Sequence, residues 1–204
     1  GCIVVWTEWG RLTRFLESAR IAFAREHTLW GTLELADAAG AKVRVENGGT
    51  VYQAGLTQHR EAVSDAWLLH ASVLLSYYAL AEAAAADKLG VDQLVSGGIE
   101  VWGQRLLDSA GANWEQVKGR QPGAVEVAVV RNTIAHGDRH YSQRAINRLQ
   151  AAGLTVATAG EPVVLDYPRL HEFRARLKSL LRVSQVGGSD SVGEPIGTEE
   201  SEHS

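Results

Sequence analysis

The stretch AWLLHASVLLSYYALAEAAAA, residues 66–86, decides the fold of this chain. It is the longest apolar run in the sequence, but His70, Glu82 and two serines interrupt it, and many of its residues are alanine, which is only weakly apolar. A membrane-spanning helix is more strongly apolar and rarely carries such polar groups, whereas small residues let two helices of a bundle approach closely. We therefore predict a buried bundle helix over residues 57–89 and no membrane span.

One face of this expected helix carries apolar residues at three- and four-residue steps, as a helix packed on one side requires. Gly90 suits its left-handed C-terminal end. His70 falls on the same face, where we expect it to be a hydrogen-bonded core residue. The predicted inner face consists of Val63, Ala66, Trp67, His70, Val73, Leu74, Tyr77, Tyr78 and Ala81.

Further segments show the same periodicity on both sides of this stretch. Pro122 suits the first turn of one of them and Gly137 suits its end, while Asp166 can cap another. The expected helices are residues 7–26, 99–109, 124–135, 142–152 and 167–183.

The period changes to two in residues 42–46, where apolar and charged residues alternate. Asn47, Gly48 and Gly49 can supply the positive φ angles of a tight turn before the next short run. This pattern predicts a β-hairpin between helices. Two more segments, residues 154–156 and 162–165, are short and β-like.

These elements predict an all-α fold, a helical bundle with a small β-hairpin insertion near residues 42–53. We expect the N-terminal helix and hairpin, residues 1–56, to pack on a helical core of residues 57–186. Residues 187–204 hold Gly, Ser and acidic residues with almost no apolar ones. Such a composition cannot bury enough apolar surface to fold, so we predict a disordered acidic tail there.

The charge of the chain is unevenly distributed. The formal net charge is -4, with 20 basic and 24 acidic residues, but five of those acids lie in residues 190–203, which leaves 20 basic residues against 19 acidic ones elsewhere. Residues 118–148 and 169–182 are predominantly basic, as a phosphate-binding surface should be, although solvated helix faces would look the same. The lone cysteine, Cys2, rules out an internal disulfide and fits a reducing, cytoplasmic compartment.

The residues that point to chemistry are VVRNTIAHGD, residues 129–138. Asn132 and His136 lie four residues apart and share a helix face, with Arg131 about 100° to one side. His136 falls at the expected C-terminal end of its helix, where the helix dipole stabilises a protonated imidazole. Arg131 offers a permanent forked donor for a phosphodiester oxygen.

Together these groups can cleave RNA without a metal. A base activates the ribose 2′-hydroxyl, a cation stabilises the charge that builds on phosphorus, and an acid protonates the leaving 5′-oxygen. One chain supplies a single strong His–Arg pair, from His136 and Arg131. A symmetric dimer would supply two such pairs across a two-fold axis.

This motif resembles that of the HEPN family, and its Ala-His-Gly ending is similar to the form in RiboL-PSP-HEPN-like bacterial proteins. Over residues 57–183, the resemblance implies a helical bundle that dimerises with its motif helices lining a shared cleft. It also implies an endoribonuclease, a toxin or antiviral defence effector, with RNA as substrate, no cofactor and a possible cognate antitoxin of the nucleotidyltransferase type. The implied catalytic residues are Arg131, Asn132 and His136.

Three neighbouring residues are weaker candidates for RNA contact. Arg139 and His140 follow the motif helix directly. Glu82 lies on a segment that resembles the family's second bundle helix, which often carries an acidic residue; it could equally be a surface or helix-pairing carboxylate.

Other interpretations stay open. The chain could be a non-catalytic HEPN module that binds RNA, nucleotide or a partner protein, or a helical interaction protein whose Arg131 and His136 are an ordinary helix-end pair. A metal site at His136, Asp138 and His140 needs a continuous helix for its two histidines, and Gly137 argues for a break. We therefore predict no metal site. No P-loop, dinucleotide fingerprint or Gly-x-Ser-x-Gly elbow occurs in the sequence.

Overall fold

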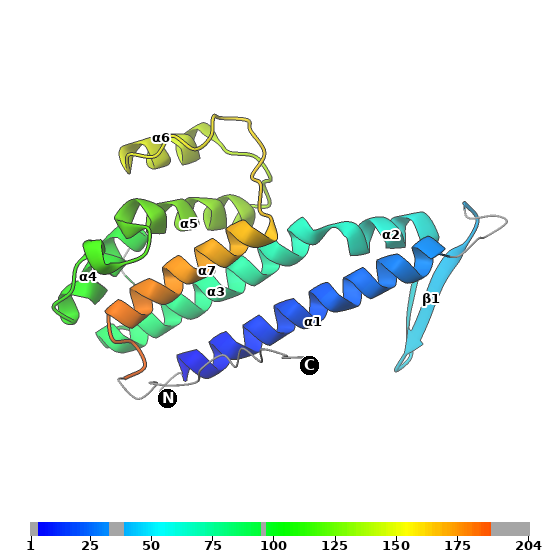
Figure 1. Ribbon diagram of the computed structural model, residues 1–204, viewed down its shortest axis with the longest axis horizontal. Helices are drawn as coiled ribbons and strands as arrows, with labels where there is room; N and C mark the ends of the chain where they lie inside the picture. Colours follow the sequence, from blue (N-terminus) through cyan, green and yellow to red (C-terminus); the bar gives the residue numbers. More distant parts are fainter. Residues whose placement is uncertain (1–3, 33–38, 95–96, 189–204) are drawn as a thin grey trace, which may run out of the picture.

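The structure is a computed structural model that describes residues 4–32, 39–94 and 97–188 (Figure 1). It is mostly helical with one small antiparallel sheet, which confirms the all-α class and the hairpin insertion. The elements are α1 (Val5–Thr32), β1 (Lys42–Asn47), β2 (Thr50–Gly55), α2 (Leu56–Ser64), α3 (Ala66–Leu89), α4 (Ile99–Ser109), a short 3-10 helix η1 (Trp114–Gln116), α5 (Arg120–Ala135), α6 (Gln143–Ala151) and α7 (Tyr167–Val183).

Helix α3 is the centre of the bundle and packs against α1, α4, α5 and α7. By length and composition it could cross a membrane, but 56% of its most apolar 18-residue stretch is buried inside the molecule, as in the core helix of a soluble protein. Its buried residues are His70, Ala71, Val73, Leu74, Tyr77, Tyr78, Ala81, Ala84 and Ala85. The bundle helix predicted from residues 66–86 is confirmed, and His70 is a core residue whose Nδ1 lies 2.9 Å from the Leu165 carbonyl oxygen.

The single helix predicted over residues 57–89 is wrong in one respect, because the chain breaks at Asp65. Its backbone leaves the helical region, with φ −79° and ψ 71°, and its side chain accepts a hydrogen bond from the Leu68 amide as the N-cap of α3. A short carboxylate that caps the following turn competes with helix continuation. The break moves Val63 and Ala66 out of the predicted inner face: Val63 is half-buried and Ala66 is exposed.

The hairpin forms in the expected register, with Asn47 opposite Thr50. Gly48 and Gly49 have φ angles of 56° and 84°, the conformation that a two-residue turn demands and that glycine adopts without strain. The hairpin lies beside α2, far from α4 and α6 (Figure 1).

The β-like segments predicted at residues 154–156 and 162–165 do not form strands. The described chain has one isolated bridge there, between His140 and Pro162. Proline lacks the amide that a longer ladder needs, so the pairing stops after one residue. The predicted tail, residues 187–204, falls outside the described residues from 189 onward.

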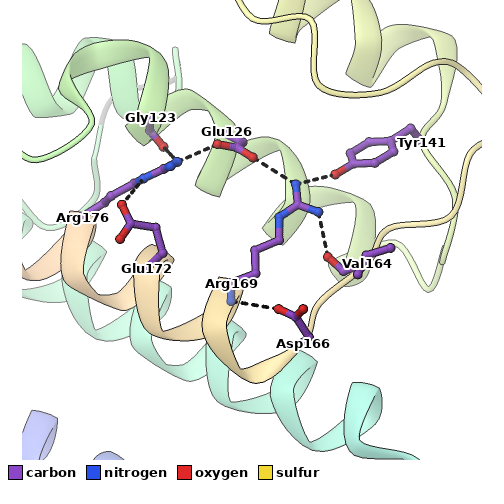
Figure 2. Close-up of polar contacts among 8 residues, drawn as sticks. All are labelled: Gly123, Glu126, Tyr141, Val164, Asp166, Arg169, Glu172 and Arg176. Carbon is purple, nitrogen blue, oxygen red and sulfur yellow. Dashed lines mark hydrogen bonds and ion pairs between the residues drawn. The ribbon is translucent and has the colours of Figure 1, made fainter.

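A buried carboxylate joins α5 to α7 (Figure 2). Glu126 is only 8% exposed, and it accepts hydrogen bonds from Arg169 Nη2 at 3.0 Å and from Arg176 Nη1 at 2.6 Å. Arg169 also donates to the Tyr141 hydroxyl at 3.0 Å and to the Val164 carbonyl at 2.7 Å. Arg169 of α7 therefore joins α5, the loop between α5 and α6, and the segment between α6 and α7.

We expect Glu126→Gln to lower the free energy of unfolding by about 3 kcal/mol, because removing one partner of a buried charge cluster leaves the remaining charges uncompensated. Urea unfolding of the purified protein measures this loss. Glu172→Gln is the matched control, since Glu172 also binds Arg176 but is 37% exposed; it should cost less than about 1 kcal/mol. Equal losses for both variants would contradict the role assigned to Glu126.

Candidate functional site

The C-terminal end of α5 positions the candidate site. Gly137 has a φ angle of 74°, its amide donates to the Ile134 carbonyl, and the Asp138 amide donates to the Thr133 carbonyl. This is the Schellman arrangement that closes a helix through a left-handed glycine. The predicted helix end at His136 and Gly137 is thus confirmed, and the chain turns so that the following residues fold back toward α5.

A cavity of about 630 Å³ lies where this turn, the start of α6 and the start of α4 meet, a volume typical of small-ligand sites. The residues that line it are Gly97, Gly98, Glu100, Val129, Asn132, Thr133, His136, Asp138, His140, Ser142, Arg144, Ala145 and Arg148. His136, Asn132 and His140 therefore share one cavity. The rings of both histidines are exposed.

Arg131 lies on the other side of α5, toward α3, and is not among the residues described as lining the cavity. Its Nη1 donates to Asn132 Oδ1 at 2.9 Å, its Nη2 lies 3.4 Å from Glu82 Oε2, and its guanidinium carbon is 4.9 Å from the centre of the Tyr78 ring. The structure thus brings Arg131 together with Asn132 and Glu82. Asn132 stands between Arg131 and the cavity that holds His136.

Burial is the largest influence on the pKa values of Glu82 and Tyr78, the two titratable groups beside Arg131. It raises the pKa of the Glu82 carboxyl above its ordinary value, and the nearby Arg131 guanidinium lowers it in part. Burial also raises the pKa of the Tyr78 hydroxyl well above its ordinary value. Arg131 Nε is buried with no hydrogen-bond partner among the described residues. Arg131 is therefore held firmly, by one carboxylate, one amide oxygen and one aromatic ring.

The contact with Arg131 also orients Asn132. A guanidinium only donates, so the atom of Asn132 that faces it must be the amide oxygen, Oδ1. The Nδ2 group of Asn132 then remains as a donor, on a residue that lines the cavity. An amide N–H held in this way can stabilise a developing oxyanion.

The two candidates that follow the helix behave differently. Arg139 turns away from the cavity toward the start of α3, where its Nη2 binds Asp65 Oδ2 at 3.1 Å and its guanidinium carbon lies 4.3 Å from the centre of the Trp67 ring. His140 lines the cavity, and its backbone amide donates to Asp138 Oδ1 at 2.9 Å. The same carboxylate oxygen lies 3.8 Å from His140 Nδ1.

Three charged residues of the cavity went unrecognised as site residues in the sequence. Arg148 binds Glu100 through two contacts, of 3.2 and 2.7 Å, and these two charges cancel. Arg144 has no ion-pair partner in the part of the chain that the structure describes, so its positive charge remains available to an anion. The four-residue spacing of Arg144 and Arg148 places them on one helix face and could have indicated the site.

Gly98 permits the close approach of the loop before α4. Its φ angle is 78°, and a Cβ atom there would come within 2.6 Å of Glu100 Oε2 and also meet the Arg148 guanidinium. A side chain at this position would thus displace the Glu100–Arg148 pair. Across residues 4–32, 39–94 and 97–188, no three His, Cys, Asp or Glu side chains are arranged to hold a metal ion.

Comparisons with family models, with curated proteins and with solved structures find no match to this chain.

We expect Arg131→Gln to raise the pKa of the Glu82 carboxyl further, because the variant removes the nearby cation and leaves the burial. A ¹³C NMR titration of the side-chain carboxyl groups measures this shift. Arg139→Gln is the matched control, since Arg139 pairs with Asp65 instead and should leave Glu82 unchanged. An unchanged or lower pKa of Glu82 in Arg131→Gln would disprove the electrostatic contact.

Proposed function

We propose that this protein is a metal-independent endoribonuclease of the HEPN type that cleaves RNA in the cavity at the C-terminal end of α5. The observation that carries the proposal is the placement of His136 and Asn132 in one cavity at a helix end, with Arg131 bound to Asn132. The spacing of these residues is that of the motif on which the resemblance rests. RNA is the substrate because the proposed attack requires a 2′-hydroxyl.

Each residue has a chemical role in this proposal. His136 transfers a proton, and as the C-cap of α5 it places its exposed ring in the cavity. Asn132 donates from Nδ2 to a phosphate oxygen as negative charge builds there. Arg131, placed behind Asn132, is a positioning residue in the single chain and acts on the phosphate through the asparagine.

The wider biological expectations remain part of the proposal. The protein is then a cytoplasmic homodimer that pairs two motif helices, it acts as a toxin or antiviral defence effector, and its partner is an antitoxin of the nucleotidyltransferase type. The competing proposal is a non-catalytic HEPN module that binds RNA, nucleotide or a partner protein. RNA binding by the wild type without any cleavage would favour that module over the nuclease.

His136→Ala should lower cleavage of a fluorophore-labelled single-stranded RNA by about 10²–10⁴-fold, the usual contribution of general acid–base catalysis. The assay contains EDTA, because the proposed reaction uses no metal. The fold should persist, since the His136 ring is exposed and makes no hydrogen bond within the described residues.

His171→Ala provides the matched control for this assay. His171 is an exposed histidine on α7 outside the residues that line the cavity, so its loss should leave cleavage unchanged. Cleavage by His136→Ala at the wild-type rate, or wild-type cleavage that EDTA stops, would overturn the proposed chemistry.

A further inference from the structure

We infer that one protomer contains both proton-transfer groups of the reaction, with His140 as the general base and His136 as the general acid. The inference rests on the proposed ribonuclease function and adds a second catalytic histidine to it. It starts from the observation that both rings line the same cavity, although Gly137 separates them onto different elements.

The backbone of His140 is fixed even though its side chain is 59% exposed. His140 forms the bridge with Pro162, and its neighbours make three backbone hydrogen bonds of 2.7–2.9 Å to residues 160–163. The next side chain, Tyr141, is buried and bound to Arg169. The anchored backbone keeps His140 at the cavity, as a site residue requires of the segment that carries it.

Asp138 lies on the Nδ1 side of the His140 ring. Its Oδ1 accepts the hydrogen bond from the His140 backbone amide and lies 3.8 Å from Nδ1 of the ring. A carboxylate on the Nδ1 side favours the tautomer with the proton on Nδ1. The lone pair of the neutral ring is then on Nε2, where it can accept a proton.

His136 is in the opposite situation. It is the C-cap of α5, at the end of a 16-residue helix, and its exposed ring lines the cavity without a carboxylate partner among the described residues. The other charged groups of the cavity are Glu100 and Arg148, which neutralise each other, together with Asp138 and Arg144. Arg144 is thus the cation available to a phosphate, and Asn132 adds an amide donor.

The proposed step balances without a further reactant. His140 Nε2 takes the proton of the 2′-hydroxyl while the 2′-oxygen forms a bond to phosphorus. The bond from phosphorus to the 5′-oxygen breaks, and His136 gives its proton to that oxygen. The products are a 2′,3′-cyclic phosphate and a free 5′-hydroxyl.

The two roles can be separated with an RNA that the wild type cuts, made also with sulfur in place of the 5′-oxygen at the cleaved position. A thiolate leaves without protonation, so this substrate needs no general acid. On normal RNA, both His140→Ala and His136→Ala should lose about 10²–10⁴-fold in kcat/KM. On the sulfur substrate, His136→Ala should recover most of its rate, whereas His140→Ala should not. His171→Ala is again the control, and circular dichroism checks the fold of each variant.

The outcomes distinguish this inference from the proposed function. A wild type that cuts no RNA overturns both. If the wild type cuts RNA and His136→Ala does not, the nuclease proposal stands; His140→Ala with wild-type rates would then overturn the second histidine alone. Recovery of His140→Ala on the sulfur substrate would show that the two roles are assigned the wrong way round.

Discussion

The Glu126 carboxylate, buried between Arg169 and Arg176, is the interaction on which the position of α5 depends. Taking the charges of Glu126, Arg169 and Arg176 largely out of water costs free energy. Their mutual attraction offsets this cost only while every partner keeps its geometry. Both arginines also lie over the ring of Phe173, at 5.2 and 5.5 Å from its centre, so α7 presents them from a fixed platform. The cluster therefore holds α5 and α7 in one register.

The cluster of Glu126, Arg169 and Arg176 also contacts the segment that carries part of the candidate site. Arg169 binds the Tyr141 hydroxyl and the Val164 carbonyl, so it contacts both the loop between α5 and α6 and the segment between α6 and α7 (Figure 2). Tyr141 comes directly after His140, and Val164 lies two residues beyond its bridge partner Pro162. A buried charge cluster thus determines where an exposed histidine stands at the surface.

The helices could be predicted from the sequence because their buried faces repeat with the helical period. The end of α5 was also predictable, since Gly137 needs no tertiary contact to adopt a left-handed conformation. The break at Asp65 could not be predicted from the sequence, because a carboxylate is common both inside helices and at their starts. The choice depended on whether the side chain would cap the Leu68 amide.

Much of the site depends on contacts that no local pattern specifies. Arg131, Asn132 and His136 could be selected because they lie close together on one segment. Glu100 and Arg148 are 48 residues apart, and Glu126 and Arg169 are 43 apart. Many arginines of the two basic segments could have formed these pairs. Only the packing of α4, α5, α6 and α7 decides which of them are neutralised and that Arg144 is left without an ion partner among the described residues.

The geometry of the helix explains why a second histidine is chemically reasonable here. Arg131 and His136 are five residues apart, and at about 100° per residue they point roughly 140° away from each other. Arg131 follows this geometry and turns toward Glu82 and Tyr78, where the half-buried carboxylate needs a cation. His136 turns toward the cavity, which His140 and two arginines of α6, Arg144 and Arg148, also line. Arg131 therefore contacts α3 and Asn132, while His136 faces the cavity together with His140. In this chain the second histidine of the cavity, and not Arg131, is the titratable group that shares the surroundings of His136.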